Sequence, residues 1–202
     1  MVPSKILKII LGVLGIVLLG FVLLNFDYFS QQIQYHVNRT FVTEVQREIR
    51  RDEKNIVLEA NELYIPTLEI RAPIIFIDGV GEEVFQPALE KGIVQYPGTA
   101  PVGVVGNTYI FGHSSDFILS KGDYKTVFAL LPNIEIGAVI QVTNERGELF
   151  EYIVYEKFVA EKTATYLLDQ DTKGKKILTL QTSYPIGTAL QRYIVKAELK
   201  PE

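Results

Sequence analysis

Apolar residues change their spacing along the chain, and the first pattern is an almost unbroken apolar run over residues 6–24. Lys8 is the only charged residue in this run. Because a helix rises about 1.5 Å per residue, a run of this length nearly crosses the ~30 Å hydrocarbon core of a bilayer. The pattern predicts a transmembrane anchor over residues 1–26, which contacts the lipid bilayer through residues 6–26.

A cleavable signal peptide and a buried core helix are the alternatives to an anchor. A signal peptide has an apolar region of about 7–15 residues, which ends in small residues at a cleavage site. The run here is longer, and it ends in Leu23, Leu24, Asn25 and Phe26 without such a site. A core helix rarely lacks polar residues over this length, so the pattern favours an uncleaved anchor.

The charges that flank the run predict its orientation. Lys5 and Lys8 lie at its start, whereas Asp27 follows it. By the positive-inside rule, we expect a single-pass protein of the cell membrane with a cytoplasmic N-terminus and an extracellular C-terminal domain. Residues 1–26 hold two lysines and no acidic residue, so the remaining 18 basic and 24 acidic residues give a net charge of −6. This charge indicates a solvated exterior domain.

Residues 30–54 contain neither glycine nor proline and predict a juxtamembrane helix that begins at Ser30 as its N-cap. Its apolar positions recur every seven residues at Tyr35, Val42 and Ile49. One stripe of this kind is typical of a helix that docks on the following domain or stands as a stalk above the membrane. A coiled-coil dimer is the other interpretation, but two heptads are few for it.

From residue 61 onward, the apolar positions alternate with polar ones or form short runs bounded by glycine and proline. This pattern is typical of strands, and Pro66 indicates an edge or a break. We expect a hairpin turn at 144–147 and short helical segments at 84–91 and 125–131. The predicted strands are 63–66, 72–77, 108–111, 139–142, 150–155, 177–181 and 193–197. Short strands at this spacing favour a closed barrel or a sandwich over residues 58–202, after a juxtamembrane helix and linker at 27–57.

Composition excludes several classes of function. The chain has no cysteine, which rules out disulfides, thiolate metal sites and a cysteine nucleophile in the chain as it stands. Two histidines and a net charge of −4 disfavour a multi-histidine zinc site and a nucleic-acid partner. Residues 169–174 are similar to half of a calcium loop, but Leu180 stands where the loop needs glutamate. We therefore expect a surface turn there, with neither a metal nor a cofactor.

Three polar residues stand where a strand would hold them rigidly beside an open surface. His113 follows an apolar strand that ends in Gly112, and Ser183 ends another strand directly after Thr182. Arg192 opens the last strand. Histidine suits acid–base chemistry near neutral pH, and arginine offers a fixed cation to an oxyanion. Taken singly, each of these residues is more often a structural or surface residue.

Taken together and in order, these residues resemble the sortases, the membrane-anchored cysteine transpeptidases of Gram-positive cell surfaces. The N-terminal anchor fits this family as well. The resemblance covers about residues 60–200. The segments that carry it are 63–66 with 72–74, 92–101, Gly106-Asn107-Thr108 through Gly112-His113, 136–140, Thr179-Leu180-Gln181-Thr182, and Arg192.

The resemblance implies a mostly β protein, in which a closed sortase-like barrel with short helices follows the transmembrane and juxtamembrane helices. It implies a transpeptidase that cleaves a C-terminal sorting signal, resembling Leu-Pro-x-Thr-Gly, on a secreted protein. The acyl group then passes to an amine of a cell-wall precursor or a pilin. By resemblance His113 is the acid, Arg192 supports the oxyanion, position 183 carries the nucleophile, and Gly112 and Thr182 shape the substrate cleft. No cofactor is implied.

One departure from the family concerns the nucleophile, because Ser183 stands where the sortases have cysteine. A serine hydroxyl is far less acidic than a thiol and needs a strong base that a third group orients. Asp116 is the only acidic residue close to His113 in the sequence. Ser183 is therefore an engineered replacement, a natural variant that binds peptides without turnover, or the nucleophile of a slow serine enzyme, unless the motif itself is misread. The alternative function is a non-catalytic peptide-binding or assembly module that uses the same groove.

Overall fold

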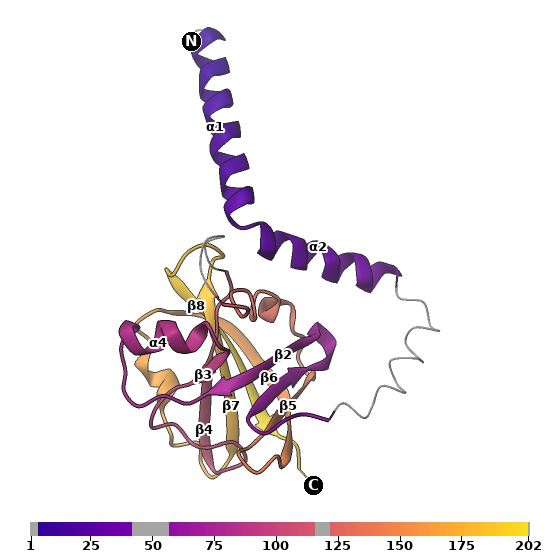
Figure 1. Cartoon of the computed structure of the whole chain (residues 1–202), viewed down its shortest axis with the longest axis vertical. Coiled ribbons are helices and arrows are strands. Elements are labelled where there is room, and N and C mark those ends of the chain that lie inside the picture. Colours follow the sequence, from indigo (N-terminus) through magenta and orange to yellow (C-terminus); the bar gives the residue numbers. More distant parts are fainter. Residues whose placement is uncertain (1–3, 42–56, 116–121, 202) are drawn as a thin grey trace.

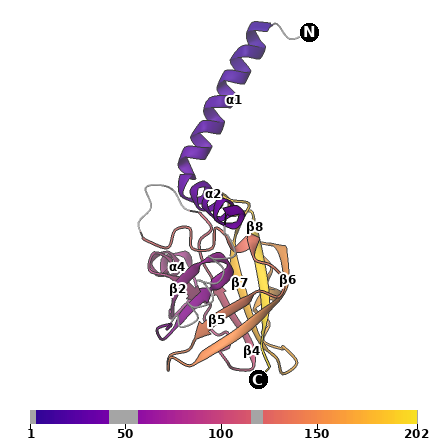
Figure 2. The same cartoon turned by 90° about the vertical axis from the view of Figure 1, so that its right-hand side faces the viewer.

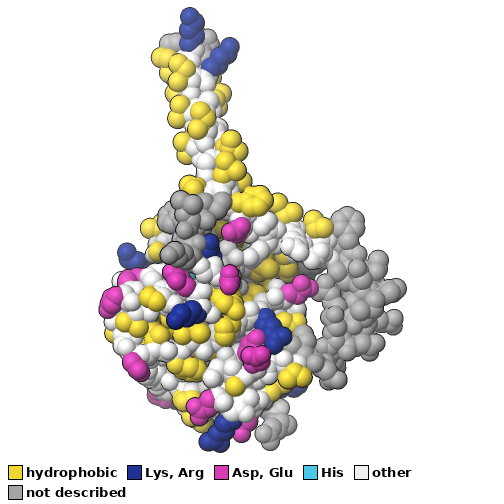
Figure 3. Space-filling model, viewed as in Figure 1, with side chains coloured by type: hydrophobic (Ala, Val, Ile, Leu, Met, Phe, Trp, Pro, Cys, Tyr) yellow, Lys and Arg dark blue, Asp and Glu magenta, His cyan; other side chains and the backbone are white. Residues whose placement is uncertain are grey.

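The computed structural model describes residues 4–41, 57–115 and 122–201. Helix α1 (Ser4–Leu24) and helix α2 (Phe26–Phe41) meet at Asn25, and α1 extends away from the rest of the molecule (Figure 1). Within α1, residues Lys5–Leu24 have a mean hydropathy of 2.8 and lie outside the protein interior. This helix is long and apolar enough to cross a membrane, as the sequence predicted. Hydrophobic side chains line it, with lysines near its free end (Figure 3).

Eight strands close into a barrel below α2 (Figures 1 and 2), and the closed β-barrel expected from the sequence is confirmed. The strands lie around the barrel in the order β1, β2, β3, β4, β7, β8, β6, β5, and β5 pairs with β1. Most neighbours are antiparallel, but β2 pairs with β3 and β4 pairs with β7 in parallel. The strands are β1 (Glu62–Ile65), β2 (Ile70–Ile75), β3 (Ile93–Gln95), β4 (Gly106–Phe111), β5 (Val139–Thr143), β6 (Leu149–Glu161), β7 (Lys176–Tyr184) and β8 (Gln191–Leu199).

Each predicted strand has a counterpart in the barrel, with shifted bounds. Pro66 breaks its run as expected, because β1 ends before it and a 3-10 turn, Pro66–Leu68, follows. Strand β6 is longer than predicted, since its pairing with β8 continues past a register shift between Val154 and Glu156. Strand β3 was not predicted, because its three residues form too short an apolar run for alternation to be visible.

Two helix predictions need correction. Helix α2 begins at Phe26, so Ser30 is not its N-cap but lies inside it, where its hydroxyl donates to the Asp27 carbonyl at 2.9 Å. The predicted segment 42–54 lies outside the described residues. The segment 125–131 is not a helix but a series of turns that lead into a 3-10 turn, Leu131–Asn133. The Phe128 N–H donates to the His113 carbonyl at 2.9 Å and not to a carbonyl of its own segment, which an α-helix would require. By contrast, the helix expected at 84–91 is present as α4 (Glu82–Leu89).

Helix α2 docks on the barrel, which is one of the two arrangements that its single stripe predicted. The Gln31 amide donates to the Thr126 hydroxyl, and the Gln32 amide donates to the Ala129 carbonyl at 3.0 Å. The Asn133 amide in turn donates to Gln32 Oε1 at 2.8 Å. Tyr35 packs against the main core cluster. A single helix therefore links the apolar span to the barrel surface.

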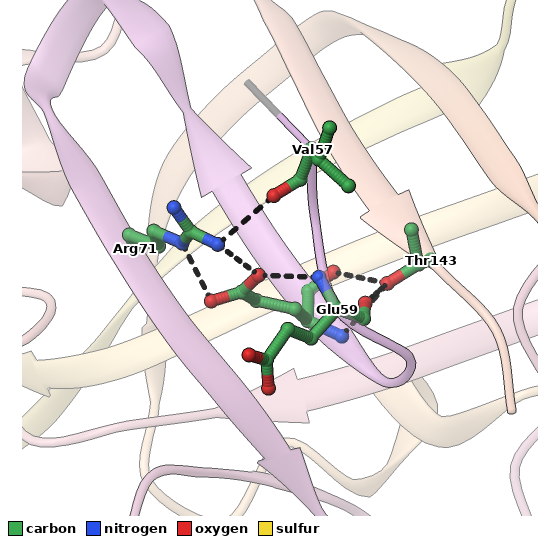
Figure 4. Close-up of polar contacts among 5 residues, drawn as sticks. Val57, Glu59, Arg71 and Thr143 are labelled. Carbon is green, nitrogen blue, oxygen red and sulfur yellow. Dashed lines mark hydrogen bonds and ion pairs between the residues drawn. The ribbon is translucent and has the colours of Figure 1, made fainter. Parts of the chain in front are cut away.

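The chain enters β1 through a polar network shown in Figure 4. The Arg71 guanidinium pairs with both carboxylate oxygens of Glu62, at 2.6 and 2.8 Å, and also donates to the Val57 carbonyl at 3.2 Å. The same carboxylate accepts the Glu59 N–H at 2.9 Å, while the Thr143 hydroxyl bonds the Glu59 carbonyl. Bidentate arginine–carboxylate pairs fix geometry as well as charge, so this network holds the entry strand against β2 and β5.

We expect Glu62→Gln to destabilise the chain at neutral pH by about 1 kcal/mol. The hydrogen bond from Arg71 lowers the pKa of Glu62, so this carboxylate stabilises the fold above the ordinary glutamate pKa. The contribution is lost as the pH falls through the lowered pKa, where wild-type Glu62 also becomes neutral. Thermal unfolding of the full chain in detergent micelles should therefore show a gap in unfolding temperature between wild type and variant at neutral pH, which closes as the pH falls below the lowered pKa of Glu62.

Glu145→Gln at the exposed hairpin tip is the matched control and should leave the unfolding temperature unchanged at both pH values. If the Glu62→Gln gap is the same at low and neutral pH, the ion pair does not carry the effect.

Candidate active site

The pairing of three strands brings the residues predicted for the site to one end of the barrel. Strands β4 and β7 run parallel with Phe111 opposite Gln181, and the Gly112 N–H continues the ladder by donating to the Gln181 carbonyl at 3.1 Å. Continued two residues past the end of β4, the same one-to-one register would bring His113 level with Ser183. On the other side of β7, Ser183 is the direct partner of Arg192 on β8. Residues of β4 thus lie beside residues of β7 that come 70 positions later in the sequence.

The alternation of side chains along β7 decides which face these residues use. Leu178 and Leu180 are fully buried in the main core cluster, and Thr182 continues this inward-facing set with 1% exposure. Ser183 therefore points to the outer face of the barrel and is half-buried. Its cross-strand partner Arg192 shares that face, because directly opposed residues in an antiparallel pair lie on the same side.

The inward-facing layer holds the strand ends in place beneath the site. The Thr182 hydroxyl donates to the Gly112 carbonyl at 2.8 Å, and both residues are buried. One residue further on, the Ser114 hydroxyl donates to the Ser183 carbonyl at 2.9 Å. These bonds join β4 to β7 where regular pairing stops, so Gly112 and Thr182 hold the two strand ends together and expose little side-chain surface of their own.

The Arg192 guanidinium lies over the start of β8. Its Nη1 atom donates to the Ala189 carbonyl at 3.1 Å and to the Gln191 carbonyl at 3.0 Å. Its positive charge also acts on Tyr109, since burial raises the pKa of the Tyr109 phenol while the charge of Arg192 lowers it in part. The cation is therefore close to the outer face of β4 as well as to β7.

Tyr109 and Gln181 belong to this face, although the sequence analysis did not select them. The Tyr109 hydroxyl donates to Gln181 Oε1 across the β4–β7 pair, which fixes the orientation of the amide. Tyr109 stands four residues before His113, and Gln181 stands two before Ser183. A period-two count back from the predicted residues would have found both, because such residues share one face of a strand.

Aromatic and apolar side chains cover the outer face on both sides of these polar residues. Tyr109 and Ile194 pack under the 3-10 turn Thr165–Leu168, which belongs to the connection between β6 and β7. Phe111 packs against Phe85 with ring centroids 5.0 Å apart, in an edge contact with α4. The register thus predicts a hydroxyl, an imidazole and a guanidinium together on a surface that apolar side chains flank. Such a set suits acyl transfer, in which a nucleophile, a proton carrier and an oxyanion partner are needed. Asp116 lies outside the described residues.

Comparisons with known proteins bear on the family and the fold. The sequence model of the sortase domain matches residues 63–200. No curated protein matches the chain in sequence.

Several solved structures share the fold. Sortase C-1 from Streptococcus pneumoniae is 24% identical over 70% of this chain and 67% of that chain, with a TM-score of 0.57. Sortase A from Corynebacterium diphtheriae is 25% identical over 70% of this chain and 60% of that one, also with a TM-score of 0.57. A Clostridium perfringens sortase D5 transpeptidase is 23% identical over 83% of this chain and 94% of that one, with a TM-score of 0.56. This chain thus spans 60% of the sortase A that it resembles but nearly the whole length of the sortase D5.

Gly112→Ala should destabilise the site end of the barrel by about 1–3 kcal/mol, as overpacking of a filled core does. An added methyl group would lie 2.8 Å from Phe128 Cδ2 and 3.0 Å from Ile93 Cγ2, and both neighbours are fully buried. Thermal unfolding in detergent micelles measures the loss.

A double-mutant cycle with Phe128→Leu tests the cause, because the smaller side chain makes room for the methyl group. The loss in the double variant should be clearly less than the sum of the two single losses. Additive losses would mean that Gly112 is needed for a reason other than this close approach.

Proposed function

The chain belongs to the sortase family, and from that premise we propose that its barrel supports sortase-type transpeptidation, slowed by serine at the nucleophile position. The observation that carries the proposal is the register of β4, β7 and β8, which supports one shared outer face for His113, Ser183 and Arg192. The reaction would cleave a C-terminal sorting signal, resembling Leu-Pro-x-Thr-Gly, on a secreted protein. The acyl group would then pass to an amine of a cell-wall precursor or a pilin.

In the first half-reaction, the group at position 183 attacks the carbonyl carbon of the Thr–Gly bond. Arg192 donates to the carbonyl oxygen as it gains negative charge, and His113 gives a proton to the amine that leaves when the C–N bond breaks. The product is an acyl-enzyme. In the second half-reaction, the acceptor amine attacks the acyl carbon, His113 takes up the proton of that amine, and the group at position 183 is released.

Serine changes where the first proton must go. A cysteine with a pKa near ~8.5 can reach the thiolate beside a protonated histidine, so His113 is already charged and can act as an acid. The Ser183 hydroxyl must lose its proton during attack, so a neutral His113 has to accept it first and return it to the leaving amine. We therefore expect slow acylation, and in the limit a site that binds the signal peptide without turning it over.

The expected location follows from α1 and from the charges around it. A single membrane anchor formed by α1 is consistent with membership of the sortase family. We propose that Lys5 and Lys8 keep the N-terminus in the cytoplasm and that the barrel stands outside the cell. In this arrangement the site meets secreted proteins after they have crossed the membrane.

Ser183→Cys should be the single change that raises activity. Sulfur takes the place of oxygen on the same half-buried side chain, and the thiol supplies a useful thiolate fraction near neutral pH. Mass spectrometry of the full chain in detergent, after incubation with a panel of sorting-signal peptides, should show a covalent adduct with the variant. The parent chain should form it slowly or not at all.

His113→Ala in the Ser183→Cys background is the control for mechanism and should lower the acylation rate about 100-fold or more. Labelling with a thiol reagent checks that the introduced cysteine is accessible. If the thiol is inaccessible to the reagent, position 183 does not face the substrate. If acylation does not depend on His113, the assigned roles are wrong. Tight peptide retention without an adduct in either chain would favour the peptide-binding module.

Arg192→Lys should lower kcat/KM of the cysteine-restored enzyme by about tenfold or more, because lysine keeps the charge but loses the planar fork of donors. Arg146→Lys at the exposed hairpin tip is the matched control and should have no effect. Since Arg192 also bonds two carbonyls of its own strand entry, the unfolding temperature of both variants is recorded alongside the kinetics. If both substitutions change kcat/KM equally, Arg192 is an ordinary surface residue without a role in the reaction.

A further inference from the structure

Helix α2 presents two opposite faces, and among the residues that the structure describes the barrel contacts only one of them. At 3.6 residues per turn, Phe26, Ile33 and Val37 fall within an arc of about 40° on one side of the helix. Gln31, Gln32 and Tyr35, which contact the barrel, lie on the other side. Phe26, Ile33 and Val37 are 56%, 64% and 47% exposed. We call these three residues the outer face of α2.

The position of α1 indicates what covers the outer face. Helix α1 ends at Leu24 and leaves α2 on the side away from the barrel, as both views of the chain show (Figures 1 and 2). Patches of hydrophobic side chains line α1 and recur along the upper edge of α2 (Figure 3). A bilayer crossed by α1 would therefore have its surface along this edge.

The elbow between the two helices is held by specific contacts. The Asn25 N–H donates to the Phe21 carbonyl at 3.2 Å, and the Phe29 N–H donates to the Asn25 carbonyl at 3.1 Å. The Asn25 side-chain amide also donates to the Phe21 carbonyl at 2.8 Å. The rings of Phe21 and Phe29 meet edge to face with centroids 6.1 Å apart. These contacts fix the angle at which α2 leaves the span.

We propose that the outer face of α2 lies in the interfacial region of the leaflet in which α1 ends, so that α2 is an interfacial helix between the barrel and the lipid. The inference uses the membrane span of α1 but none of the proposed catalytic roles. Amphipathic helices of this kind bury their apolar face about 5–10 Å into the boundary between headgroups and acyl chains. Since the outer face carries no charge, zwitterionic lipid should be sufficient.

The arrangement also orients the barrel. Gly187, in the connection between β7 and β8, lies close to the elbow, where a Cβ on it would be 3.2 Å from Asn25 Oδ1 and 3.4 Å from Phe21 Cε2. This connection joins Ser183 to Arg192. With α2 on the lipid surface, the end of the barrel that carries the candidate site is the end nearest the bilayer.

The chain contains no cysteine, so single cysteines can report the depth of chosen positions. Ile33→Cys and Val37→Cys in the full chain would each carry a fluorophore in phosphatidylcholine vesicles, with a quencher on lipid placed just below the headgroups. Leu149→Cys is the matched control. Leu149 is a 52% exposed apolar residue on β6, at the barrel end opposite the Ser183–Arg192 pair. Leu14→Cys in α1 reports insertion of the span.

Quenching at positions 33 and 37 should exceed that at position 149 by about threefold or more, as expected for side chains that contact lipid. Adding Val37→Lys to the chain labelled at position 33 should reduce the quenching there. Quenching at position 14 together with values at 33 and 37 no higher than at 149 would overturn the inference while leaving the anchor intact. No quenching at position 14 would overturn both. Efficient disulfide cross-linking of Ile33→Cys between copies, without quenching, would also overturn the inference by assigning the outer face to a second chain.

Discussion

The parallel pairing of β4 with β7 is the constraint on which the site depends. Parallel neighbours cannot be joined by a tight turn, so the intervening chain has to pass through β5 and β6 before β7 can return beside β4. At the end of this pair the Thr182 hydroxyl bonds the Gly112 carbonyl, and the Ser114 hydroxyl bonds the Ser183 carbonyl. Each bond ties one strand end to the other, so the polar residues above this layer stand on a rigid base.

Much of the fold could be predicted from local patterns, because burial on one face of a strand leaves a period of two in the sequence. This signal located most of the strands, and a long apolar run located α1. It missed β3, whose three residues are all buried and so show no alternation. It also gave a helix at 125–131, where the decisive bond is the long-range one from the Phe128 N–H to the His113 carbonyl. Local patterns carry no information about partners so far away in the chain.

In the candidate site, too, the local sequence identified individual residues but not the contacts between them. The order of motifs in the sequence selected His113, Ser183 and Arg192, but only the register shows that Ser183 pairs with Arg192 and that β4 leads toward them. Tyr109 and Gln181 were missed because neither residue type suggests catalysis when taken singly. Their hydrogen bond across β4 and β7 depends on pairing that periodicity does not encode. The tight packing around Gly112 could not be predicted either, because nothing in the local sequence indicates that this residue faces Phe128 and Ile93.

The fold and the chemistry of position 183 are largely independent of each other. The strand is held there by the Ser183 carbonyl, which accepts the Ser114 hydroxyl, and by its pairing with Arg192. Both interactions are made by the backbone of residue 183, so exchange of oxygen for sulfur on the side chain leaves them unchanged. The neighbouring Thr182 and Gly112 are fixed by each other and not by Ser183. A barrel of this design can therefore keep its backbone geometry when the side chain at position 183 changes. Under the proposed function, the rate of acyl transfer then depends on the acidity of that side chain and on the proton that His113 would carry.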